Sequence, residues 1–204
     1  MNEEMSAMPE TAQPVREAKA NRLPVGRLRE LVAALNGYGR VFALVRRGRD
    51  ISLAPLAAGR PLQLARRLPT VGPEEAVLPP ADALFGARLQ PMDMGYDTGA
   101  IVLFAIPPCL IYSIRFLDRL LASGPFRDAG YATRRSRSLL VAMNCAKRRR
   151  ECYCEGLGIG PALRRTSDAD IVLTPVGSGF TVESGSTPGA QILSSIGIEA
   201  GAGA

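Results

Sequence analysis

Three of the four cysteines lie in one stretch, Ser138 to Pro161, which reads SLLVAMNCAKRRRECYCEGLGIGP. Cys145 follows an apolar run, and Cys152 and Cys154 form a C-x-C pair shortly afterwards. Thiolates are soft ligands for iron–sulfur clusters and zinc. In an extended or looped backbone, a C-x-C pair can direct both sulfurs at one acceptor. The stretch therefore predicts a site where thiols do chemistry.

Glycines follow the C-x-C pair at every second position. Gly156, Gly158 and Gly160 come just before Pro161. Glycine permits positive φ and a close approach of the main chain to a ligand. We expect a backbone turn beside the cysteines.

Two apolar runs predict the strands that position the thiols. Ala100 to Ile106 indicates a buried strand with Cys109 close behind it, and Leu139 to Met143 indicates a second one before Cys145. Leu110 to Leu121 has helical spacing and predicts a crossover helix between them. If the strands are parallel neighbours, Cys109 and Cys145 emerge at the same edge of the sheet. We therefore expect all four thiols to converge.

The remaining elements complete an α/β fold, a single domain with a mixed, partly parallel sheet, crossover helices and a Pro-rich irregular segment. The irregular segment is Pro61 to Pro91, with one helical turn expected at Asp82 to Phe85. The other predicted elements are a short helix within Leu23 to Leu35, a hairpin of Val41 to Val45 with Ile51 to Leu53, a strand pair of Asp170 to Val176 with Gly179 to Glu183, and a closing helix over Pro188 to Ile196.

Length and composition favour one domain in a reducing compartment. The chain has 204 residues, of which 47% are hydrophobic, enough for one substantial core. We expect a disordered arm over 1–22, the domain over 23–197 and a disordered tail over 198–204. No apolar run reaches the length of a membrane span, and the start lacks a secretion signal, so we expect a cytoplasmic protein with reduced thiols.

Charge and the absence of histidine narrow the function classes. A chain without histidine has no Ser-His-Asp or Cys-His catalysis and no His-ligated zinc. The net charge of +6 is concentrated between Arg127 and Arg165, where ten Lys or Arg face three acids. Such a field favours an acidic partner. The composition argues against nucleic-acid binding, since aromatic residues make up 5% and no binding motif is present.

An ordered set of motifs resembles the amino-terminal region of a family of two-cluster (4Fe-4S dicluster) iron–sulfur electron-transfer subunits. The family includes the beta subunit of soluble sulfhydrogenases and the A subunit of anaerobic sulfite reductase. The motifs that match are Cys109, Leu117-Asp118-Arg119, Asp128 with Tyr131 to Arg135, Asn144-Cys145, Cys152-Tyr153-Cys154 and Gly158-Ile159-Gly160-Pro161. The resemblance covers roughly residues 38 to 195.

The resemblance implies an accessory electron-transfer subunit of a cytoplasmic multi-subunit oxidoreductase, of the hydrogenase or sulfite-reductase type, without turnover of its own. Two features depart from the family. Pro107 and Leu110 replace the Arg and Asp expected around the first cysteine, and the ferredoxin-like part with its two cluster-binding runs does not follow. The implied partners are a ferredoxin-like iron–sulfur subunit and a catalytic oxidoreductase subunit.

The sharpest hypothesis is that Cys109, Cys145, Cys152 and Cys154 bind one iron–sulfur cluster, most simply 4Fe-4S. Zinc held by the same thiols in a structural or interaction module without redox function is the main alternative, and ordinary structural or redox-active cysteines are the third. A basic face is expected to dock the ferredoxin-like partner. Its members are Arg134, Arg135, Lys147, Arg148, Arg149 and Arg150.

Overall fold

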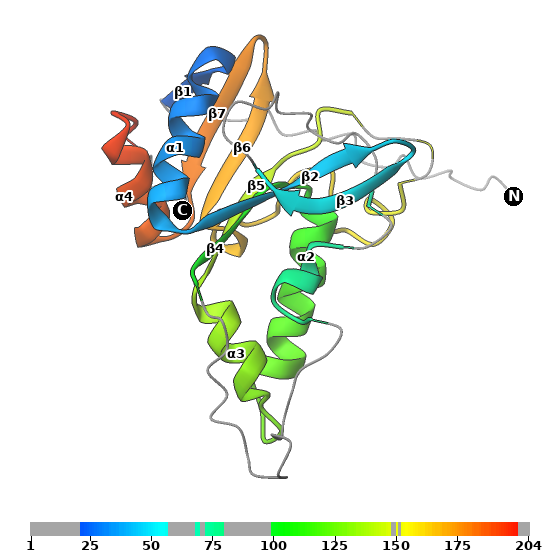
Figure 1. The fold of residues 1–204 in the computed structure, drawn as a ribbon. Coiled ribbons are helices and arrows are strands. Elements are labelled where there is room, and N and C mark those ends of the chain that lie inside the picture. Colours follow the sequence, from blue (N-terminus) through cyan, green and yellow to red (C-terminus); the bar gives the residue numbers. More distant parts are fainter. Residues whose placement is uncertain are drawn as a thin grey trace, which may run out of the picture.

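The structure is a computed structural model that describes residues 21–56, 68–69, 72–79, 99–147, 150 and 152–199. In this part of the chain the strands form one seven-stranded mixed sheet of order β1-β7-β6-β5-β4-β2-β3 (Figure 1). The strands are β1 (Asn21–Pro24), β2 (Arg40–Arg47), β3 (Asp50–Pro55), β4 (Ile101–Ile106), β5 (Ser138–Met143), β6 (Ile171–Val176) and β7 (Gly179–Ser184).

The centre of the sheet is parallel and its edges are antiparallel. β2 pairs with β4, β4 with β5 and β5 with β6, each in parallel. β3, β7 and β1 join by antiparallel pairing. The predicted parallel arrangement of the two strands that precede Cys109 and Cys145 is therefore confirmed, as is the α/β fold class.

Helices cover both faces of the sheet. They are α1 (Leu28–Tyr38), α2 (Pro108–Leu117), α3 (Ala129–Ser136) and α4 (Thr187–Ser195), with a π-helical turn, η3 (Asp118–Ala122), after α2. α1 and α4 lie together on one side, and α2 and α3 lie on the other (Figure 1).

Alternation along the strands builds a core on each face. Within β5, Leu139 and Val141 pack with α1 and α4, whereas Leu140 and Ala142 pack with α2. All four side chains are buried. Because successive strand residues point to opposite faces, a strand covered on both sides is apolar throughout.

Most elements fall where the sequence places them. The hairpin of β2 and β3 turns at Gly48, whose φ of 64° suits glycine. α1 begins at Leu28 rather than Leu23, because Leu23 is buried in β1 against β7. Cys109 lies inside the first turn of α2 instead of preceding the helix.

Some expectations differ from the structure or lie outside it. Pro73–Ala76 forms a 3-10 turn, η2, within the segment expected to be irregular. Ile198, placed in the tail by the sequence, is buried in the core beside α4. The arm before Asn21, the turn at 82–85, most of 61–91 and the last five residues lie outside the described residues.

Candidate functional site

Cys109 stands at the carboxyl edge of β4, where the chain leaves the sheet through an irregularity. The register of β4 with β5 shifts between Leu103 and Ile106, and Ala105 adopts a φ of 58°. A left-handed alanine costs of order 1–2 kcal/mol and is held by its surroundings. The bulge redirects the chain into Pro107, after which α2 begins at Pro108, and Cys109 lies half-buried in its first turn.

Cys145 stands at the same edge, two positions after the end of β5, and is exposed. Its backbone N–H donates a hydrogen bond of 3.0 Å to the carbonyl oxygen of Pro161. The end of the glycine-rich segment therefore returns to the residue that follows β5. This pairing closes the loop that carries Cys152 and Cys154.

Asn144, which sequence reasoning used only as part of a motif, fixes that closure. Its Nδ2 donates to Thr174 Oγ1 at 2.7 Å, and its Oδ1 accepts from the N–H of Leu163 at 3.0 Å. Its own N–H donates to the carbonyl of Leu173 at 2.8 Å. One side chain thus joins the end of the cysteine loop to β6, the neighbouring strand.

Cys154 is held inward by the glycine turn predicted from the sequence. The N–H of Ile159 donates to the Cys154 carbonyl at 2.8 Å, and Gly158 has a φ of 64°. A Cβ added at Gly160 would lie 3.0 Å from the Cys154 sulfur, so glycine allows the thiol to lie against the main chain. Gly156 is exposed, and a Cβ added there would lie 3.6 Å from the carbonyl oxygen of Tyr153.

The thiols of Cys145 and Cys154 lie close enough to Cys109 to affect its electrostatics. Burial, and after it the nearby thiols of Cys145 and Cys154, raises the pKa of the Cys109 thiol to about 11. The backbone N–H groups of Leu110 and Cys109 act in the opposite direction by favouring the thiolate. The parallel strands and the loop therefore bring three of the predicted ligands into one neighbourhood, while Cys152 lies half-buried at the start of the loop.

The chemical type of the donor atoms suits an iron–sulfur cluster, but their arrangement is not that of a complete ligand set. Four cysteine thiols are the right ligand type, and one of them, Cys109, lies in the first turn of α2, at the positive end of that helix. Within the described residues, however, no group of three or more Cys, Asp or Glu side chains is arranged to hold a metal ion. The thiols share an edge of the sheet without forming a closed ligand set.

The predicted basic face divides into two groups. Lys147 and Arg150 are exposed beside the cysteine loop, and Arg148 and Arg149 lie outside the described residues. Arg135 is 16% exposed and pairs with Asp118, and Arg134 Nε donates to the carbonyl of Val77 at 2.9 Å. The side chains of Arg134 and Arg135 thus hold the domain together on the α3 side, so they do not extend a surface around the cysteines.

Asp118 is the hub of a polar cluster that the sequence did not reveal. Its Oδ1 accepts hydrogen bonds from Tyr131 Oη at 2.7 Å and from Arg135 Nε at 3.0 Å, and its Oδ2 accepts from Arg115 Nη1 at 3.2 Å. Burial and the bond to Asp118 raise the pKa of Tyr131. The spacing of Arg115 and Asp118 along one helix face was the available signal, but Tyr131 and Arg135 reach Asp118 only through tertiary packing.

None of the helices in the described ranges is long and apolar enough to cross a membrane.

Comparison with known proteins gives one informative match. The chain is 27% identical over 164 residues to "Sulfhydrogenase 2 subunit beta" of Pyrococcus furiosus, a match that covers 80% of this chain and 48% of that protein. No family model matches the chain, and no solved structure matches it. The chain spans about half the length of the curated relative it matches. The match relates the chain to the beta subunit of a sulfhydrogenase.

Proposed function

We propose that the chain is an electron-transfer subunit of a cytoplasmic hydrogenase-type oxidoreductase, in which Cys109, Cys145, Cys152 and Cys154 ligate an iron–sulfur cluster, most simply 4Fe-4S. The observation that supports this most is the shared neighbourhood of Cys109, Cys145 and Cys154 at the carboxyl ends of β4 and β5. The relative, a sulfhydrogenase subunit, supports the same class of function.

The protein groups have separable roles in this proposal. A bound cluster would supply a one-electron carrier whose potential depends on hydrogen bonds to its sulfurs. The N–H groups of Cys109 and Leu110 favour the thiolate of Cys109. Asn144 and Gly160 hold the loop with the Cys154 thiol against the main chain, in the neighbourhood of Cys109. Ligation displaces a proton from Cys109, so binding should strengthen as the pH rises.

The side of the molecule that carries the cysteine loop suits an acidic redox partner. Tyr153 is 82% exposed and Leu157 is 70% exposed, shortly before and after the turn at Cys154. Exposed cations stand before and after them in the sequence: Lys147, Arg150 and Arg164. Exposed apolar groups within a positive rim are typical of a steered protein contact. We propose that a ferredoxin-like iron–sulfur subunit docks here and that a catalytic subunit completes the complex.

Anaerobic purification tests the cluster. We expect brown protein with stoichiometric iron and acid-labile sulfide, and loss of both when Cys109, Cys145 or Cys154 is replaced by serine. Tyr153→Phe is the matched control in the same loop and should keep the cluster. Colourless protein that contains zinc would identify the zinc module instead, and protein that binds neither metal would leave only structural thiols.

Charge reversal tests the docking surface. Lys147→Glu combined with Arg150→Glu should weaken binding of a reduced two-cluster ferredoxin and reduce the salt dependence of that binding. Arg119→Glu, at another exposed cation on η3, should leave binding unchanged. Equal weakening by both changes would contradict a surface centred on the cysteine loop.

A further inference from the structure

A polar pocket of about 250 Å³ lies at the edge of the sheet opposite the cysteines. It is bounded by the amino ends of β5 and β6, the carboxyl end of β7 and the start of α4. Four charged side chains line it: Arg115, Arg135, Asp168 and Asp170. The pocket shares no lining residue with the cysteine loop, so a ligand bound in it would be independent of the proposed function.

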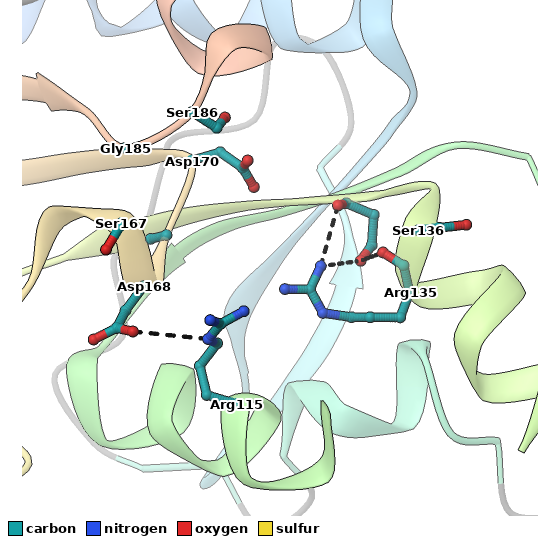
Figure 2. A pocket seen from close by; sticks show the side chains of 10 residues that line it. Arg115, Arg135, Ser136, Ser167, Asp168, Asp170, Gly185 and Ser186 are labelled. Atoms are coloured by element: carbon teal, nitrogen blue, oxygen red, sulfur yellow. Dashed lines mark hydrogen bonds and ion pairs between the residues drawn. The ribbon is translucent and has the colours of Figure 1, made fainter. Parts of the chain in front are cut away.

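Two guanidinium groups enter the pocket from the same side. Figure 2 shows Arg115, from α2, and Arg135, from α3, directed toward a common space, with Asp170 and Ser186 across from them. Asp118 binds both arginines from behind, and Arg135 Nη1 donates to Ser138 Oγ at 3.0 Å. Within the described residues neither Nη2 atom has a hydrogen-bond partner. Two positively charged guanidinium groups are therefore fixed in place, each with an Nη2 that can donate hydrogen bonds to a ligand.

The opposite side of the pocket presents negative charge. Asp170 is anchored because its Oδ2 accepts from the N–H of Leu140 at 2.8 Å, which leaves Oδ1 without a donor among the described residues. Asp168 is 6% exposed, and its nearest charge is Arg115 Nε, 3.7 Å from Oδ1. Its Oδ2 lies 3.9 Å from Nε of the exposed Arg165 and accepts no hydrogen bond, and a buried acceptor left without one costs about 1–3 kcal/mol. This buried acceptor lowers the stability of the fold, as unsatisfied groups at functional sites often do.

We propose that this pocket binds a small zwitterion of the α-amino acid type. The carboxylate lies between Nη2 of Arg115 and Nη2 of Arg135, and the ammonium group faces Asp170. The lining carries two positive and two negative charges. A simple anion would be repelled by Asp170, and a simple cation would not relieve the repulsion between the two arginines. The volume equals roughly eight water molecules at about 30 Å³ each, which matches the size of an amino acid.

Binding is tested on the full chain with the twenty common L-amino acids at millimolar concentration, by ¹⁵N–¹H correlation spectra. At least one should shift the amides of Gly185, which lines the pocket, and of Leu140 and Gly189, which donate hydrogen bonds to the lining side chains of Asp170 and Ser186. The same molecule without its amine, and the same molecule without its carboxylate, should each bind at least about tenfold more weakly, equivalent to about 1.4 kcal/mol.

Variants locate the two contacts. Arg115→Gln and Asp170→Asn should each weaken the best ligand about tenfold or more, whereas Arg119→Gln on the adjoining η3 should not. Asparagine keeps an acceptor for Leu140, so its effect reports the lost charge. If Arg115→Gln unfolds, Arg115→Lys provides the test, since it keeps the charge but loses the fork. Binding of no amino acid, or equal binding of the amine-free analogue with no effect of Asp170→Asn, would overturn the proposal.

Discussion

The hydroxyl of Tyr131 donates a hydrogen bond of 2.7 Å to Oδ1 of Asp118 and so ties α3 to the turn that follows α2. Tyr131 is fully buried, and Asp118 is 15% exposed. The carboxylate is simultaneously paired with Arg115 and Arg135. The two helices on this face of the sheet are joined through this one acid.

Tyr131→Phe should lower the free energy of unfolding by about 1.5–3 kcal/mol, because it removes a buried hydrogen bond to a charged group and leaves the ring in place. Urea denaturation measures the loss. Tyr112→Phe on α2 is the matched control, since no hydrogen bond of the Tyr112 hydroxyl occurs within the described residues, and it should be neutral within about 0.5 kcal/mol. Equal losses in the two variants would rule out the Asp118 bond as the cause.

Asn144→Ala should free the end of the cysteine loop from β6. It removes the donor to Thr174 and the acceptor for Leu163, which together are worth about 1–3 kcal/mol. Hydrogen exchange should accelerate at the Leu163 and Cys145 amides while the central amides of β5 stay protected. Asn36→Ala, which removes one exposed bond in α1, is the control and should leave the loop unchanged.

Gly160→Ala should displace Cys154. The new Cβ would stand 3.0 Å from the sulfur and 3.1 Å from the Cβ of Cys154, closer than ordinary packing allows. We expect a loss of about 1–3 kcal/mol in the free energy of unfolding and faster modification of Cys154 by a thiol reagent. Gly156→Ala, whose Cβ would meet the Tyr153 carbonyl at 3.6 Å, is the matched change and should alter neither quantity appreciably.

The raised pKa of Cys109 predicts a loss of stability in alkali. An unfolded cysteine titrates at about 8.5, and the folded thiol titrates at about 11. The folded state holds the proton of Cys109 more tightly than the unfolded state does. The protonated thiol therefore contributes fully to the free energy of unfolding below the unfolded pKa, and this contribution disappears as the pH rises from the unfolded pKa toward and through the folded pKa. Urea midpoints of the metal-free protein should therefore fall over this window.

Cys109→Ser separates this effect from the titration of Tyr131, whose raised pKa destabilises the fold at high pH in the same direction. The difference in free energy of unfolding between the wild type and Cys109→Ser should narrow as the pH rises through this range, because Tyr131 contributes equally to both proteins. A constant difference would show that Cys109 does not titrate as described.

Elements with strong local signals were predictable. Residues 101–104 are all buried and apolar, so β4 could be identified from the sequence alone. β1 could not, since Leu23 is buried between the exposed Arg22 and Pro24, and the segment becomes a strand by pairing with β7. α3 was missed for a similar reason. Its sequence AGYATRRS is mostly polar, and the helix relies on the Asp128 cap and on the packing of Tyr131.

The same distinction applies to the sites. Parallel strands followed by cysteines predict a shared edge, because strand direction fixes where each chain leaves the sheet. The placement of Cys152 depends on loop geometry that strand patterns do not determine. The polar pocket was beyond sequence reasoning, since Arg115, Arg135 and Asp170 come from different elements and meet only when the sheet is complete.

The pairing of β1 with β7 has a consequence for synthesis on the ribosome. Asn21–Pro24 is the first strand of this sheet to emerge, but its hydrogen-bonding partner, Gly179–Ser184, is the last strand of the sheet to be translated. Until β7 has been made, Leu23 has no core to be buried in, and the nascent segment must stay unpaired. Completion of the sheet therefore waits for the hairpin of β6 and β7, and a product that stalls before it would present an open strand edge to its neighbours.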